Sequence, residues 1–97
     1  MKIIYKEISL LNESEKNVLE ELTKEYYQKL SNIIEIREMI IDVHPHSKGG
    51  KRKRYNAIIH ILGPHNLDTN TEEWDLIPAL HSAFKKLIKE AEHKLHK

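Results

Sequence analysis

The last 24 residues, WDLIPALHSAFKKLIKEAEHKLHK, constrain the fold most strongly because their apolar residues recur every three or four positions. This spacing predicts a helix with a single apolar stripe. Asp75 is a suitable N-cap, and Pro78 lies in the first turn, where a missing N–H removes no helical hydrogen bond. The predicted stripe comprises Leu76, Leu80, Ala83, Phe84, Leu87, Ile88, Ala91 and Leu95. Such a helix must be covered on one side by another layer of structure.

A second helix is predicted near the start of the chain, in NESEKNVLEELTKEYYQKLSNII. Either Asn12 or Ser14 is a suitable N-cap, and the glutamates that follow suit the positive end of a helix dipole. The apolar positions again have helical spacing; they are Val18, Leu19, Leu22, Tyr26, Tyr27, Leu30 and Ile33. This helix is therefore also expected to bury one stripe.

The remaining segments have the alternation of strands. They are residues 2–8, residues 34–44, residues 53–62, and a short polar edge strand within 67–74. Because Ile34 and Ile36 have the opposite parity to Met39, Ile41 and Val43, the second strand should have either a bulge or a late start near Arg37. Gly49 and Gly50 can adopt the positive φ of a hairpin turn, so the second and third strands should meet there. The order β-α-β-β-β-α with sequential antiparallel strands predicts an α+β two-layer sandwich, with one four-stranded sheet and two helices on one face. Tyr55 and Trp74 are expected in its core.

Composition restricts the class of protein. A length of 97 residues predicts a single domain spanning 1–97, and 39% hydrophobic with 32% charged residues is typical of a soluble globular chain. Without cysteine there is no disulfide or thiolate zinc site, which favours the cytoplasm. We expect no secretory signal and no membrane-spanning segment, because no apolar run approaches the required length.

The net charge of +1 conceals an uneven distribution. Residues 1–43 carry six Lys/Arg against nine Asp/Glu, whereas residues 44–97 carry ten against six and all seven histidines. The second half of the chain is therefore expected to create a positive field that attracts anions.

The supply of catalytic and metal-binding residues is small. The pairs His44/His46 and His93/His96 have chelating spacing, but no carboxylate or cysteine stands beside them to complete a metal site. Gly49-Gly50-Lys51 lacks the Ser/Thr of a phosphate-binding loop, and no serine lies in a nucleophile context. We therefore predict a protein that is not an enzyme and that needs no cofactor, metal or small-molecule substrate.

Two clusters of basic residues are the strongest functional signal. The first surrounds the hairpin and comprises Lys48, Lys51, Arg52, Lys53 and Arg54. The second follows the last helix and comprises Lys85, Lys86, Lys89, His93, Lys94 and Lys97. Each cluster alone is typical of a solvated surface or of a helix C-terminus. Because both occur in one half of a small domain, together they favour binding to a phosphate backbone.

These features resemble the ribosome hibernation-promoting factor family, also called ribosome-associated inhibitor A or sigma-54 modulation proteins. The resemblance rests on the β-α-β-β-β-α order, on GGKRKRY before an alternating strand, and above all on EEWDLIPALHSAFKKLIKEAEHK. The first helix also fits the family's pattern at Leu19, Leu22, Tyr27, Lys29 and Leu30. Because the sequence ends after the last helix, the resemblance is to the short forms, which lack a C-terminal dimerisation domain.

The resemblance implies a monomeric stress-response protein that silences idle ribosomes. In the family, this domain binds ribosomal RNA in the decoding region of the small subunit, where messenger and transfer RNA would bind. The positions that carry over are Lys86, Lys89, His93 and Lys94 on the last helix and Lys29 on the first. Glu20 and Tyr26 occupy positions of the first helix that are often basic in the family, and His93 stands where lysine is usual.

Two alternatives remain open at this point. The expected fold resembles the double-stranded-RNA-binding domain, so a module for free structured RNA is one alternative. Acidic residues at the start of the last helix, where that domain has lysines, disfavour it. The other alternative is a protein-interaction module in which the acidic first helix docks on a basic partner through Glu13, Glu15, Glu20, Glu21 and Glu25.

Overall fold

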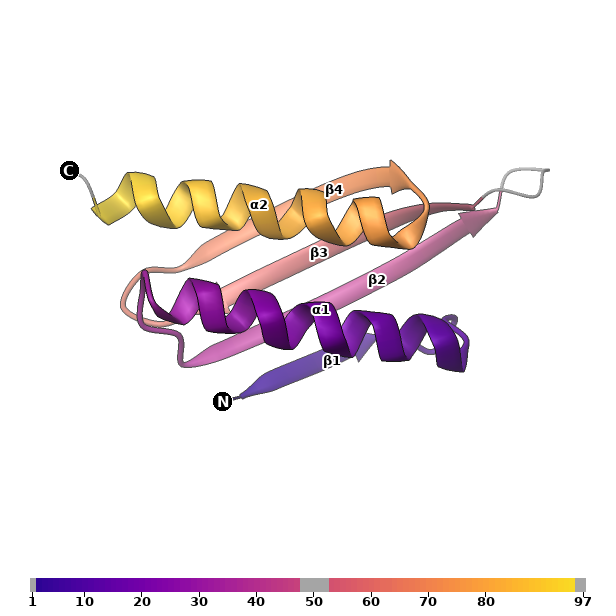
Figure 1. The fold of residues 1–97 in the computed structure, drawn as a ribbon, viewed down its shortest axis with the longest axis horizontal. Coiled ribbons are helices and arrows are strands. Elements are labelled where there is room, and N and C mark those ends of the chain that lie inside the picture. Colours follow the sequence, from indigo (N-terminus) through magenta and orange to yellow (C-terminus); the bar gives the residue numbers. More distant parts are fainter. Residues whose placement is uncertain (1, 48–52, 96–97) are drawn as a thin grey trace.

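A computed structural model describes residues 2–47 and 53–95. The elements follow the predicted β-α-β-β-β-α order: β1 (Ile3–Glu7), α1 (Glu13–Ser31), β2 (Glu38–Ser47), β3 (Lys53–Leu62), β4 (Leu67–Trp74) and α2 (Leu76–Leu95). The strands form one sheet in the order β1-β2-β3-β4, and Figure 1 shows both helices lying across the same face of it. The predicted α+β two-layer sandwich is therefore confirmed.

One strand pairing differs from the sequence prediction. β2, β3 and β4 are antiparallel neighbours as expected, but β1 pairs with β2 in parallel, which makes the sheet mixed. The reason is the connection, because α1 carries the chain back along the sheet before β2 begins, and such a crossover joins parallel strands. The register of this pair places Ile3 beside Met39 and shifts between Tyr5 and Glu7.

The helix starts are defined by local chemistry. Asn12 accepts a hydrogen bond from the backbone N–H of Glu15 at 2.8 Å, and the Glu15 side chain accepts one from the N–H of Asn12 at 3.0 Å. This reciprocal capping box selects Asn12 over Ser14 as the N-cap of α1. Asp75 precedes α2 with a φ of 69°, and its carbonyl accepts the first helical bond, from the N–H of Ala79.

The core lies between the sheet and the helices. Every second residue of the central strands is buried toward the helices, as the alternation predicted. These strand residues are Met39, Ile41, Val43, Tyr55, Ala57, Ile59 and Ile61, and the helices cover them with Leu19, Leu30, Leu80, Phe84 and Leu87. In the described part of the chain, no helix covers the other face of the sheet (Figure 1).

Contacts of Tyr26 join the two helices. Its ring stacks on the Phe84 ring at 4.7 Å between centroids, with the planes 7° apart. Its hydroxyl shares a hydrogen bond with Nδ1 of His81. One side chain of α1 is therefore held by α2 through both packing and polar contact.

The connection from β3 to β4 requires glycine at one position. A Cβ atom on Gly63 would lie 2.7 Å from the carbonyl oxygen of Glu35, which is closer than such atoms approach. The nearby backbone is paired, since the N–H of Arg37 donates to the carbonyl of Leu62 at 2.9 Å. This contact fixes the segment before β2 against the end of β3.

The details of the strand predictions had different outcomes. Of the two alternatives near Arg37, a bulge or a late strand start, the structure has the late start, because β2 begins at Glu38. Tyr55 is 6% exposed and lies in the core as predicted. The prediction for Trp74 was wrong: its side chain is 40% exposed, because its place in β4 turns it toward the open face of the sheet. The glycine turn lies outside the described residues, but the flanking pair of Ser47 with Lys53 shows that β2 and β3 meet as expected.

Candidate nucleic-acid interface

The C-terminal half of α2 presents a basic groove. The groove has a volume of about 570 Å³ and runs between the helix and β4; it is lined by Thr69, Lys86, Lys89, Glu90, His93 and Lys94. Lys86, Lys89 and His93 are three and four residues apart, so they share one side of the helix. That side adjoins the buried stripe, which places the lysines at the rim of the groove rather than on the outer ridge of α2.

The charges in the groove have the character that binding to phosphate requires. Lys86, Lys89 and Lys94 outnumber the one acid, Glu90, so the groove is positive even when His93 is neutral. Among the described residues, neither Lys86 nor Lys89 forms an ion pair. The Nζ atom of Lys94 donates to the carbonyl of Asn66 at 3.1 Å, which ties the helix to the turn before β4. Lys86 and Lys89 therefore keep their charge available for a partner.

The other predicted residues of the helical layer lie outside this groove. Lys85 is exposed on the outer ridge of α2, about 100° around the helix from Lys86. Lys29 lies on the side of α1 that faces α2, with its Nζ atom 5.1 Å from the centroid of the Tyr26 ring. The predicted basic residues of the helices therefore lie in three places. Lys86, Lys89, His93 and Lys94 line the groove, Lys85 is on the outer ridge of α2, and Lys29 is beside Tyr26.

The hairpin cluster is only partly described. Lys48, Lys51 and Arg52 lie outside the described residues, and Lys53 is exposed at the start of β3. Arg54 is engaged within the protein. Its Nη2 atom lies 3.3 Å from a carboxylate oxygen of Glu72, and its guanidinium stacks over the Trp74 ring at 5.2 Å. Arg54 is therefore positioned by its own sheet rather than extended toward a partner.

The two basic regions lie toward opposite ends of α2. The carbonyl of Lys53 accepts a hydrogen bond from the N–H of Asp75, so the hairpin strands end where α2 begins (Figure 1). Lys89 follows Asp75 by 14 residues, which corresponds to roughly 21 Å along a helix. A partner that contacts both regions must therefore be extended on that scale.

α1 has the opposite charge. Glu13, Glu20, Glu21 and Glu25 are exposed on it, whereas Tyr26 is buried against α2. Lys29 is the basic residue of its last turn. The helical layer therefore presents an acidic helix beside a basic one, and the positive surface is concentrated on α2.

Tyr26 and Tyr55 are buried, and each contacts a helix through a hydroxyl group that stays neutral. Burial raises the pKa of Tyr26 above its usual value, as does the nearby charge of Glu25. Burial, together with the hydrogen bond to Glu15 and its charge, raises the pKa of Tyr55 to about 12. Both hydroxyls therefore remain protonated at physiological pH, and Tyr55 donates its hydrogen bond to the start of α1.

The described residues form neither a metal-binding cluster nor a membrane-spanning helix. Within residues 2–47 and 53–95, no three His, Asp or Glu side chains come together as metal coordination requires. In the same part of the chain, neither helix is long and apolar enough to cross a membrane. The predictions that the protein is not an enzyme and binds no metal remain predictions.

Sequence reasoning missed two features of the open sheet face. One is the contact of Arg54 with Glu72 and Trp74, which requires the strand register between β3 and β4. The other is the position of Asp42. The alternation of β2 places it opposite the buried side, but only the structure shows that one of its oxygens is shielded from solvent.

Comparison with known proteins gives a likeness of fold. No family model matches the chain, and no curated protein matches it. Among solved structures, the crystal structure of the Protein Y N-terminal domain from Thermus thermophilus is similar, with a TM-score of 0.58 and 15% sequence identity. The match covers 95% of this chain and 93% of that one. At this identity the likeness extends to the arrangement of helices and strands over nearly the whole length.

Proposed function

We propose that residues 1–97 form a ribosome-binding domain that docks in the decoding region of the small ribosomal subunit. It occupies ribosomal RNA where messenger and transfer RNA would bind, and so keeps idle ribosomes from translating. It acts by occupying this site and not by catalysis.

The observation that carries the proposal is the basic groove between α2 and β4. Lys86 and Lys89 stand at its rim without an ion pair among the described residues, and Lys94 and His93 extend the positive surface toward the end of the helix. Lysines spaced three or four residues apart along a helix contact successive phosphates of a nucleic-acid backbone. The groove is therefore the centre of the proposed interface, and Lys29 and Lys85 are proposed contacts outside the groove.

Two further observations support this function. The sequence pattern from the hairpin to the end of α2 resembles the hibernation-promoting factor family. The fold is similar to that of the Protein Y N-terminal domain across nearly the full length of both chains. The same positions, Lys86, Lys89, His93 and Lys94, are thus selected by the resemblance and brought together by the structure.

Free duplex RNA is a poorer candidate partner. Glu72, Glu73 and Asp75 are exposed beside the start of α2. These acids oppose a phosphate that approaches the helix N-terminus, which is otherwise a favourable anion site. The positive groove lies on the C-terminal half of α2. An RNA partner is therefore expected to contact that half of the helix and not its N-terminus.

The test is co-sedimentation of the protein with separated small and large ribosomal subunits, with a free RNA duplex as competitor. We expect retention on the small subunit alone, surviving a rise from about 50 to about 150 mM KCl despite the weakening that phosphate contacts undergo with salt. Equal binding to both subunits, or loss of the protein to the duplex, would contradict the proposal. A decline with salt much shallower than release of counterions from several phosphates requires would instead favour a protein contact through acidic α1.

A further inference from the structure

The sheet face that carries no helix is partly apolar and partly polar. The side chains on this face alternate with the buried ones. On the side of β1 and β2 it presents the half-buried Ile4 and Ile40, and β3 adds Ile58 directly opposite Asp42. On the side of β4 it presents Asn70 and Glu72. This face is separate from the groove on α2, since the helices lie on the other side of the sheet (Figure 1).

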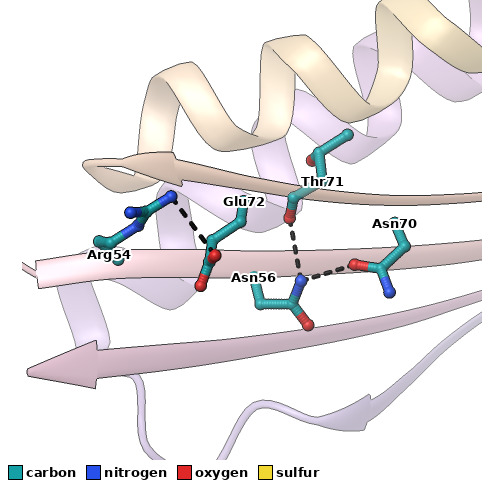
Figure 2. A network of polar contacts seen from close by, with 5 residues as sticks. All are labelled: Arg54, Asn56, Asn70, Thr71 and Glu72. Carbon is teal, nitrogen blue, oxygen red and sulfur yellow. Dashed lines mark hydrogen bonds and ion pairs between the residues drawn. The ribbon is translucent and has the colours of Figure 1, made fainter.

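The polar part on β3 and β4 satisfies most of its own hydrogen bonds. Figure 2 shows the Asn56 side chain, which donates to the Asn70 side chain at 2.6 Å and to the carbonyl of Thr71 at 3.1 Å. Beside it, Arg54 contacts Glu72 at 3.3 Å. These contacts join neighbouring strands and hold their side chains in fixed positions. The β4 half of the open face is therefore prearranged, and Arg54 already has a carboxylate partner, although its shielded Nε donor has no hydrogen bond among the described residues.

Asp42 differs from these residues. It lies on β2 opposite Ile58, with Ile40 and His44 two residues away on the same face. The Oδ1 atom of Asp42 is shielded from solvent and has no hydrogen-bond partner among the described residues. A shielded polar group without a hydrogen bond costs free energy, and a charged one costs more. Asp42 therefore has a carboxylate oxygen without a donor, on a side chain that is half-buried as a whole and lies on the open face.

The charge around Asp42 selects the kind of donor. Among the described residues, the register places Glu7, Glu38, Asp42, Asp68 and Glu72 on the open face, against Arg54 and Lys2, which pairs with Glu38 at 3.6 Å. Because Arg54 is bound to Glu72, the excess charge is negative when the histidines are neutral. This field attracts a cation and repels a phosphate. A basic side chain also has an alkyl stem, which packs on apolar neighbours such as Ile40 and Ile58.

We propose that the open sheet face around Asp42 binds a lysine or arginine side chain of a protein partner. The charged end donates hydrogen bonds to the Asp42 carboxylate, and the stem lies on Ile40 and Ile58. This goes beyond the proposed binding of RNA, because it assigns a second surface with the opposite charge on the other side of the sheet. The molecule would then contact phosphate through α2 and a basic protein segment through β2 and β3.

The experiment is an NMR titration of the 97-residue chain with a short capped peptide of alternating valine and arginine. A peptide with citrulline in place of arginine has nearly the same shape without the charge and serves as the ligand control. The variants are Asp42→Asn and Asp68→Asn, which make the same substitution on the same face at a shielded and at an exposed position. Thermal unfolding of both variants shows whether the fold is kept.

The expected result is that the arginine peptide shifts the backbone signals of Ile40, Asp42 and Ile58, and that the citrulline peptide does not. Asp42→Asn should weaken binding about tenfold or more, consistent with the loss of a charge-assisted hydrogen bond, whereas Asp68→Asn should change it less than twofold. The melting temperature of Asp42→Asn should not fall, because the variant removes a charge that lacks an internal partner.

Several results would overturn the proposal. Equal effects of the two variants would indicate diffuse attraction in place of a site at Asp42. Peptide shifts confined to α1 would place the cation site on the acidic helix. A clear drop in the melting temperature of Asp42→Asn would mean that Asp42 has a structural role, and shifts at Ile40 and Ile58 caused by an RNA duplex would make this face an RNA surface.

Discussion

Replacing both Lys86 and Lys89 by glutamate is expected to weaken binding to the small ribosomal subunit by about 100-fold. Each lysine stands at the rim of the groove with its charge free of ion pairs among the described residues. Losing one charge-assisted contact to phosphate costs roughly 1.5 kcal/mol, and two such losses correspond to about two powers of ten in affinity. The measurement is a binding curve from co-sedimentation with purified small subunits at fixed salt.

The matched control is Lys16→Glu with Lys24→Glu. It changes the net charge of the protein by the same amount, but on α1, away from the groove. We expect a loss of less than tenfold for this variant, and likewise for Lys51→Glu with Lys53→Glu at the hairpin. If all three double variants lost affinity equally, the attraction would be diffuse and the groove would have no special role.

Replacing Phe84 by alanine is expected to lower the free energy of unfolding by about 3–5 kcal/mol. Phe84 is fully buried and its ring stacks on Tyr26, so the change leaves a cavity where the two helices meet. A domain of this size has a total stability of about 5–15 kcal/mol, so the loss is a large share of it. Urea unfolding followed by circular dichroism measures the effect.

Phe84→Leu serves as the control because it keeps an apolar side chain in the same place. It should cost about half as much or less, since part of the cavity remains filled. If Phe84→Ala and Phe84→Leu both left the free energy of unfolding nearly unchanged, the packing of the Phe84 ring would contribute little. The helices would then be held by the sheet rather than by each other.

The architecture could be predicted from the sequence because the spacing of apolar residues was regular and the glycines and prolines marked the ends of elements. Alternation in β2 and β3 identified Met39, Ile41 and Val43 as buried, and the helical stripe of α2 was correct at Leu80, Phe84 and Leu87. These patterns depend only on which residues face the core. The parallel pairing of β1 with β2 does not leave such a local signal, because it depends on where the crossover helix returns the chain.

The candidate site was predictable only as a set of residues. Charge counting identified both basic clusters, and helical spacing identified the shared side of Lys86, Lys89 and His93. Neither charge counting nor helical spacing could show that Arg54 is held by Glu72, because that contact joins two strands and residues 18 positions apart in sequence. The groove itself also requires the placement of α2 beside β4, which follows from packing and not from the sequence of either element.

Trp74 shows why one prediction failed. A large apolar residue just before a helix commonly packs against it, and this is the reason for expecting Trp74 in the core. In the structure its position in β4, opposite Arg54, sets the direction of the side chain, and the guanidinium covers one face of the ring. Strand register thus overrode the local tendency at the helix start.

Chemical probing of ribosomal RNA in small subunits, with and without the protein, tests the central claim most directly. We predict that the protein shields nucleotides of the decoding region where messenger and transfer RNA bind, and that the Lys86→Glu, Lys89→Glu variant loses this protection at the same concentration. Protection confined to another region of the subunit, or no protection at concentrations that give full co-sedimentation, would contradict the account.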